Sequence, residues 1–161
     1  MTIELVLVRH AKSNWGDPGL SDHERPLNGR GRRDAPVMAE RLAQTGVEVE
    51  RILSSTAVRA RTTAEVFGRA LGVEVEPDPE LYLASAQTLL AKATASGTAS
   101  VMVVAHDPGL SDLAAQLSGG GIEHMPTCAV ARFGWNGGSW DEARDRAADE
   151  WWFDSPREGA G

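Results

Sequence analysis

The sequence predicts an α/β fold in which helices cover both faces of a mainly parallel central sheet. Two segments, Ile3–Val8 and Val101–Ala105, are apolar at nearly every position, which is typical of strands buried on both faces. Segments whose apolar residues follow a helical spacing alternate with the predicted strands. With 161 residues, 42% of them hydrophobic, we expect a single domain over residues 1–161, built as three α/β/α layers.

The predicted elements follow one another along the chain as strand, loop and helix. Residues 11–27 contain Gly, Pro, Asp and Asn, and they predict a long loop after the first strand. Asn28 is a suitable N-cap for a helix that runs to about Thr45, although Pro36 favours a kink or a later start near Asp34. The other predicted helices cover 56–71, 84–95 and 108–117, and the other predicted strands cover 51–54, 73–75, 128–135 and, at an edge, 150–153.

Charge and cysteine content narrow the class of protein. The net charge is −7, which disfavours a nucleic-acid partner. The segment from Arg9 to Arg33, however, contains six basic and only three acidic residues, a balance that suits a small anionic ligand. The single cysteine, Cys128, permits no intramolecular disulfide, and no apolar run is long enough to span a membrane. Because the first ten residues also lack a basic leader, we expect a cytoplasmic protein with no membrane partner.

Polar side chains follow three predicted strands at the point where each strand ends. Arg9 and His10 close the first strand, Arg59 follows the second, and His106 closes a later one. Ligands of parallel sheets bind outside this edge. A guanidinium matches phosphate oxygens and keeps its charge, and an imidazole can attack phosphorus or donate a proton. The pattern therefore predicts phosphate chemistry, and since no residues have metal-ligand spacing, we expect no metal and no cofactor.

The segment LVRHAKS, residues 7–13, resembles the N-terminal signature of the histidine phosphatase superfamily, also called the phosphoglycerate-mutase-like family. Three later segments resemble further blocks of that family in the same order: SDHERPLNGRGRRDA at 21–35, ILSSTAVRARTTAEVF at 52–67 and VMVVAHDPGLSDL at 101–113. The short chain and its RPLN segment are most similar to the SixA-type phosphohistidine phosphatases of the family. The resemblance implies a phosphoglycerate-mutase-like fold and a phosphatase whose own histidine becomes phosphorylated.

Carried over residue by residue, the resemblance assigns roles to positions of this chain. It implies that His10 is the nucleophile that accepts the phosphoryl group. The side chains that it implies as contacts of that group are Arg9, Ser13, Arg25, Arg59 and His106.

Two positions bear on how far these roles apply. Ala11 stands where the family has glycine, which is harmless unless the backbone there has a positive φ. Larger members use a glutamate as general acid, and Glu80 is the nearest candidate in this chain. A phosphohistidine releases imidazole, a better leaving group than an alkoxide, so a missing acid harms its hydrolysis less. We therefore predict a metal-independent phosphatase of phosphohistidine on a signalling protein, such as a histidine phosphotransfer domain.

Other interpretations stay open at this point. The substrate could instead be a small phosphate ester, or the chain could bind phosphate or a phosphoprotein without turnover. Arg30, Arg32 and Arg33 are interpreted as the solvated first turns of a helix, with phosphoprotein recognition as the alternative. His23 and His124 are interpreted as solvated loop residues.

Overall fold

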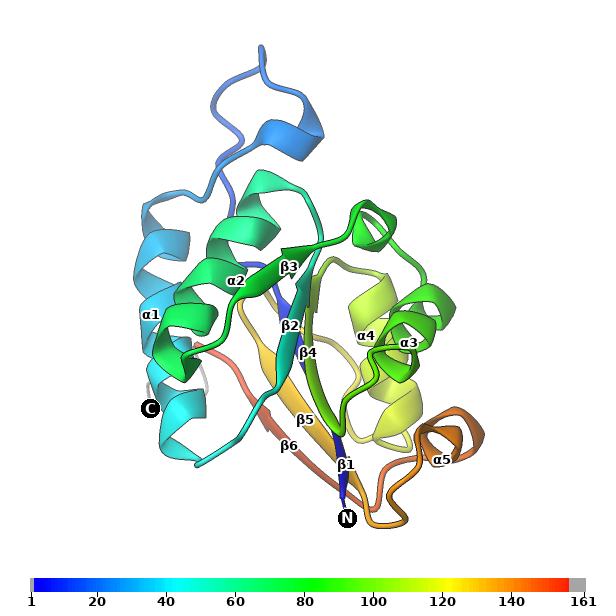
Figure 1. Ribbon diagram of the computed structural model, residues 1–161. Helices are drawn as coiled ribbons and strands as arrows, with labels where there is room; N and C mark the ends of the chain where they lie inside the picture. The colour runs from blue at the N-terminus through cyan, green and yellow to red at the C-terminus, as the bar shows by residue number, and fades with distance from the viewer. Residues whose placement is uncertain (1, 157–161) are drawn as a thin grey trace.

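Six strands form one mixed sheet in the computed structural model, which describes residues 2–156 (Figure 1). They are β1 (Ile3–Arg9), β2 (Arg51–Ser54), β3 (Val75–Pro77), β4 (Ser100–Ala105), β5 (Val130–Trp135) and β6 (Glu150–Asp154). Their order across the sheet is β3-β2-β4-β1-β5-β6. The first four strands of that order are parallel to one another. Strand β5 pairs antiparallel with β1, and β6 pairs antiparallel with β5.

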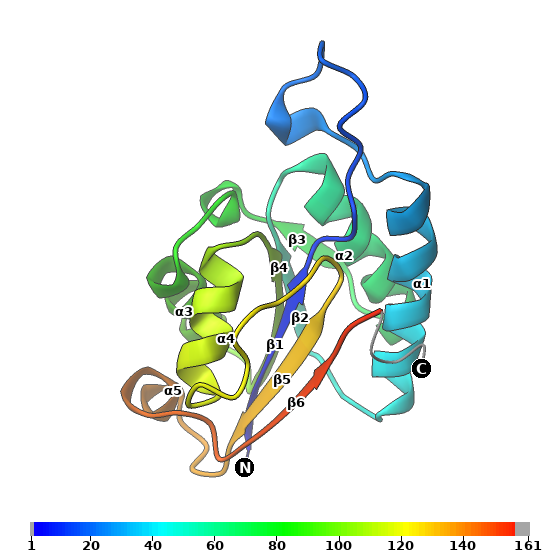
Figure 2. The ribbon, with the colours of Figure 1, turned by 180° about the vertical axis from the view of Figure 1, so that it is seen from behind.

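Helices cover both faces of the sheet, so the predicted three-layer α/β/α class is confirmed (Figures 1 and 2). The helices are α1 (Gly29–Gln44), α2 (Val58–Leu71), α3 (Ala86–Thr94), α4 (Gly109–Leu117) and α5 (Trp140–Asp145), with short 3-10 turns η1 (Asp22–Glu24) and η2 (Pro79–Leu81). One face carries α1 and α2, and the other carries α3 and α4. The predicted edge position of the last strand is also confirmed.

The alternation of side chains along β1 divides the core into two layers. Ile3, Leu5 and Leu7 point to the face covered by α3 and α4, and Val6 and Val8 point to the face covered by α1 and α2. All five side chains are buried. Because neither face of the strand meets water between Leu5 and Val8, its sequence there is a continuous apolar run instead of an alternating one.

The chain leaves β1 and β4 in opposite directions. These neighbouring parallel strands lead to α1 and α4, which lie on opposite faces of the sheet. The carboxyl ends of two strands that diverge in this way leave a crevice between them, the usual ligand site of such sheets. In Figure 1 this edge is the upper one, where residues 11–27 rise above the sheet as the loop between β1 and α1.

Helix α1 shows one agreement and one error of the sequence prediction. It begins at Gly29, where the Asn28 side chain caps it by accepting a hydrogen bond from the amide of Gly31 (2.8 Å). The alternative start near Asp34 is wrong, since the helix continues through Pro36. Pro36 is exposed, so water can serve the carbonyl oxygen that its missing N–H leaves unpaired.

Two further differences concern short elements. Strand β3 covers Val75–Pro77, two residues later than predicted, and α5 at Trp140–Asp145 was not predicted. Helix α5 has six residues, too few for a periodic apolar pattern to be recognised.

Candidate active site

Two histidines lie side by side where β1 and β4 end. The parallel register places Arg9 opposite Ala105, so the next residues of the two strands, His10 and His106, are neighbours. The amide of His10 donates to the carbonyl oxygen of Ala105 (3.2 Å), and the two imidazole centroids are 5.2 Å apart. The sheet register therefore brings together two residues that are far apart in the sequence.

His10 is held in one tautomer by its own backbone. Its Nδ1 lies 2.8 Å from the carbonyl oxygen of Ala11, and a carbonyl only accepts, so Nδ1 carries the proton and Nε2 keeps its lone pair. The pKa of His10 is lowered to about 4, mainly by burial; the Ala11 hydrogen bond opposes this effect, and the charges of Arg59 and Arg9 add to it. The imidazole is therefore neutral at pH 7 and offers Nε2 as a nucleophile.

His106 is equally buried and is oriented by a hydroxyl. Its Nε2 lies 2.7 Å from Oγ of Ser55, the residue that follows β2. Burial, with smaller contributions from His10 and Arg59, lowers the pKa of His106 to about 3. The edge of the Tyr82 ring packs against the imidazole with 5.4 Å between centroids.

A cavity of about 240 Å³, hereafter the His10 cavity, opens over these two imidazoles. Its lining residues come from the strand ends and from the loops above them: Arg9, His10, Lys12, Ser13, Trp15, Arg25, Arg59, Leu83, His106, Asp107 and Thr127. Four of them are basic and one is acidic, so the cavity favours an anion. It has room for a phosphoryl group, and its volume is below the roughly 300 Å³ at which typical small-molecule sites start.

Asp22 orients two of the arginines. One carboxylate oxygen accepts from Nε and Nη2 of Arg25 (3.2 and 3.0 Å), and the other accepts from Nη2 of Arg59 (3.0 Å) and from the Tyr82 hydroxyl (2.5 Å). Arg59 also donates to the Asp22 backbone carbonyl (2.6 Å). The hydrogen bond from Tyr82, followed by those from the arginines, holds the pKa of Asp22 below its usual range. A charged Asp22 therefore fixes Arg25 and Arg59 at the His10 cavity.

Arg9 is fixed separately. Its Nη1 donates to the carbonyl oxygen of Met125 (2.9 Å) and lies 3.5 Å from a carboxylate oxygen of Asp107. The Asp107 carboxylate in turn accepts from Oγ of Ser111 at 2.7 and 2.8 Å. Each guanidinium of the cavity thus has protein partners that hold its plane.

Hydrogen bonding around the His10 cavity is incomplete. Four buried side-chain nitrogen or oxygen atoms among residues 2–156 lack a hydrogen-bond partner, and three of them belong to Arg9, Arg59 and His106. Buried polar groups without partners are rare in folded proteins and often occur at binding sites.

The backbone around His10 is tied to α2. The amide of Ala11 donates to Oγ1 of Thr63 (3.0 Å), and that hydroxyl donates to the carbonyl oxygen of Arg59 (2.8 Å). Ala11 is buried and is not among the residues with positive φ, so alanine fits where the related family has glycine. Cys128, by contrast, has φ 63°, and its amide donates to the carbonyl oxygens of Arg9 and His10.

The structure brings most of the predicted site residues together. Ser13 lies in the His10 cavity, where its Oγ accepts from Nη1 of Arg25 (2.7 Å). Glu80 does not line the cavity, since its carboxylate pairs with Lys92 (2.7 Å) and is 69% exposed. The prediction of His23 as a solvated residue is wrong, because its Nε2 lies 2.7 Å from Oγ1 of Thr56 and its ring packs on Tyr82.

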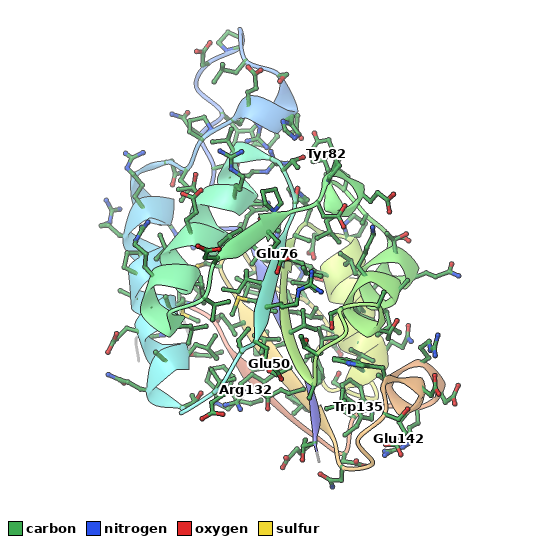
Figure 3. The ribbon with its side chains drawn as sticks, in the orientation of Figure 1. Glu50, Glu76, Tyr82, Arg132, Trp135 and Glu142 are labelled. Carbon is green, nitrogen blue, oxygen red and sulfur yellow. The ribbon has the colours of Figure 1, made fainter. Side chains whose placement is uncertain are left out.

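Sequence reasoning missed Asp22, Tyr82 and Trp15. Tyr82 lies at the upper end of the molecule in Figure 3, on the side of the sheet edge that carries the histidines. Its contact with Asp22 joins parts of the chain that no local pattern connects. The only local signal was the spacing of Asp22 and Arg25 within one 3-10 turn, which permits their ion pair.

The part of the chain from 2 to 156 has neither a membrane-spanning helix nor a metal-ligand cluster. No helix in this part of the chain is long and apolar enough to cross a bilayer. Within the same range, no three or more His, Cys, Asp or Glu side chains are grouped as metal ligands would be.

The sheet order and the paired histidines at its carboxyl edge define a phosphoglycerate-mutase-like α/β protein. Residues 5–82 match the model of the histidine phosphatase superfamily, branch 1. An uncharacterized chloroplastic protein of Arabidopsis thaliana is 35% identical over 153 residues, which cover 86% of this chain and 69% of that protein. The phosphohistidine phosphatase SixA of Escherichia coli is 34% identical over 141 residues, 80% of this chain and 83% of that one.

Solved structures agree with these relatives. A structure of the protein histidine phosphatase SixA complexed with tungstate superimposes with a TM-score of 0.77 at 29% identity, covering 97% of this chain and 99% of that chain. The chain therefore belongs to the histidine phosphatase superfamily and is a phosphatase of that superfamily.

Proposed function

We propose that the protein is a metal-independent phosphohistidine phosphatase that works through a phosphorylated His10. The observation that carries the proposal is the His10 imidazole, whose Nδ1 proton is held by the Ala11 carbonyl and which lines a cavity together with three arginines. Its depressed pKa, about 4, keeps it unprotonated at neutral pH. SixA of Escherichia coli, a relative at 34% identity, is named as a phosphohistidine phosphatase.

The first step is attack of His10 Nε2 on phosphorus. The N–P bond to His10 forms as the bond to the leaving group breaks, and the negative charge on the transferring oxygens is balanced by Arg9, Arg25 and Arg59. His106 hydrogen-bonds the same group. In the second step water attacks the phosphoryl group of phospho-His10 and releases inorganic phosphate, which returns His10 to its neutral form.

The leaving group explains why phosphohistidine is the preferred substrate. Glu80 is outside the His10 cavity, Asp22 is held ionised by its partners, and Asp107 is committed to Arg9 and Ser111. A site organised in this way has no carboxylic acid free to protonate an alkoxide. Imidazole leaves more easily, and a protein substrate such as a histidine phosphotransfer domain presents it.

Hydrolysis assays with three substrates test this proposal. We expect turnover of a phosphohistidine protein and of phosphoramidate, weak turnover of an alkyl phosphate, and no effect of a chelator. His10→Ala should lower all three rates by about 1,000-fold or more, as removal of a covalent nucleophile does in other enzymes. Denatured wild-type protein quenched during turnover should carry acid-labile phosphate.

Each part of the proposal fails on a different result. Residual activity of His10→Ala near that of wild type would contradict the covalent mechanism, and loss of activity with chelator would contradict metal independence. A preference for the alkyl phosphate would identify an ester phosphatase. Phosphate binding without any turnover would identify a binding module.

A further inference from the structure

Two exposed apolar side chains lie at the mouth of the His10 cavity. Among residues 2–156 four large hydrophobic side chains are exposed, and two of them, Trp15 (71%) and Leu83 (56%), line this cavity. The other two, Val37 and Trp151, lie on α1 and β6. Grouped apolar exposure at a polar cavity is typical of a contact surface. On the basis of the proposed function, we propose that Trp15 and Leu83 form an apolar rim that binds the polypeptide carrying the phosphohistidine.

The indole of Trp15 is fixed before any substrate arrives. The Arg25 guanidinium carbon lies 3.4 Å from the indole centroid, in a cation–π contact. Arg25 is itself buried and held by Ser13 and Asp22. One face of the indole therefore rests on a fixed cation while the rest of the ring is open to solvent. A side chain already held in place loses little conformational entropy when a partner covers it.

Leu83 is exposed because of its backbone conformation. It has φ 53°, a left-handed value that leucine rarely adopts because its Cβ then crowds the following carbonyl oxygen. The residues before it are anchored, with Leu81 buried in the core and the Tyr82 hydroxyl bonded to Asp22. Strained backbone that directs an apolar side chain into solvent at a ligand cavity is typical of functional positions.

The size of the cavity indicates that the occupant is a polypeptide. At about 240 Å³, the His10 cavity is below the roughly 300 Å³ at which typical small-molecule sites begin, so it does not enclose a phosphoryl group together with a large carrier. The rest of the substrate must then lie outside, on the rim. A phosphorylated histidine on a protein surface is flanked by side chains that can cover Trp15 and Leu83. A nucleotide, whose base could stack on Trp15 alone, is the competing occupant.

Rim variants separate carrier binding from chemistry. We would measure Trp15→Ala, Trp15→Phe and Leu83→Ala on a phosphorylated histidine phosphotransfer domain and on phosphoramidate, which has no carrier. We expect kcat/KM for the phosphoprotein to fall about 10- to 30-fold through KM in both alanine variants, the usual range for an interface anchor. The loss on phosphoramidate should be at least about 10-fold smaller, and Trp15→Phe should retain most activity on both substrates. Val37→Ala and Trp151→Ala, the matched exposed controls, should lose nothing on either substrate.

Several results would contradict the proposal that Trp15 and Leu83 bind the carrier. Equal losses on both substrates would mean that Trp15 and Leu83 act through Arg25 or the fold, and no loss would mean that they contact no carrier. Efficient hydrolysis of a nucleoside monophosphate that depends on Trp15 would make the occupant a nucleotide. If wild-type protein hydrolyses phosphoramidate but not the phosphoprotein, the proposed substrate is wrong. That result comes from the wild-type protein alone, so it is distinct from a failure of the rim, which only the variants reveal.

Discussion

Asp22 joins two arginines of the His10 cavity to Tyr82, although its side chain is 44% exposed. Both carboxylate oxygens of Asp22 accept hydrogen bonds, so in an asparagine the NH₂ group would face the donors of one partner. The substitution also removes the charge that orients both guanidinium groups. We expect Asp22→Asn to lower kcat/KM by about 10- to 100-fold, because misplacement of a charge-balancing group by about 1 Å has effects of that size. Steady-state kinetics on phosphoramidate, with thermal unfolding alongside, measure this effect.

Glu24→Gln is the control for Asp22→Asn. It removes the same charge from the same 3-10 turn, where Glu24 is exposed. Kinetics as poor as those of Asp22→Asn would show that net charge, and not the orientation of the arginines, controls the rate.

The residues that the sequence could predict are those next to strand ends. His10 and His106 follow apolar runs, and such runs are visible without a structure. Asp22 and Tyr82 could not be found in this way, because their contact depends on how the loop after β1 folds back over η2. Glu80 shows the opposite error: it is close to the site along the chain, but the η2 turn directs it to Lys92.

At the scale of elements, α1 packs close to the backbone beside the site. A Cβ at Gly31 would overlap the carbonyl oxygen of Lys12, two residues after His10, and that oxygen also accepts from the amide of Asn28 (3.0 Å). We expect Gly31→Ala to lower the free energy of unfolding by about 1–3 kcal/mol, since α1 must shift to relieve the overlap. Urea unfolding monitored by tryptophan fluorescence measures the change.

Gly29→Ala is a matched control in the same helix. The nearest atom to a Cβ at Gly29 is the end of the flexible Arg33 side chain, at 3.3 Å, which can move away. Its stability should stay within about 0.5 kcal/mol of wild type, as for most surface substitutions. Because alanine has the higher helix propensity, an equal loss in both variants would mean that the contact with Lys12 is not what destabilises Gly31→Ala.

The order of helices and strands was largely predictable because their apolar periods are long and regular. The start of α1 was predicted through the Asn28 cap, whereas Pro36 was overweighted as a helix breaker. Its exposed position makes the lost hydrogen bond tolerable, and exposure depends on which face the helix buries. The antiparallel pairing of β5 with β1 and with β6 has no local signal, since strand direction is set by the chain path between elements.

At the scale of the whole molecule, two buried neutral histidines link stability to pH. The pKa values of His10 and His106 are about 4 and about 3 in the folded protein, and both return to about 6.5 on unfolding. Between pH 7 and pH 5 the unfolded chain therefore takes up protons at both positions and the folded chain does not. Each histidine should lower the free energy of unfolding by about 2 kcal/mol over this interval.

Urea unfolding at pH 7 and pH 5 tests this linkage. His10→Asn should remove about 2 kcal/mol of the wild-type difference between the two pH values. If the variant loses as much stability as wild type on acidification, His10 is not held neutral by the fold.

Cys128 carries the sole thiol of the chain and is buried. Its amide donates hydrogen bonds to the carbonyl oxygens of Arg9 and His10. Burial raises its pKa to about 12, so the sulfur stays a protonated thiol. Peroxides and alkylating reagents attack exposed thiolates, and phosphatases that use a cysteine nucleophile are inactivated by them. The proposed nucleophile here is an imidazole, and the only thiol is buried and protonated, so these reagents find no reactive thiolate. The enzyme that we propose should therefore keep working under oxidative stress that silences thiolate-dependent phosphatases.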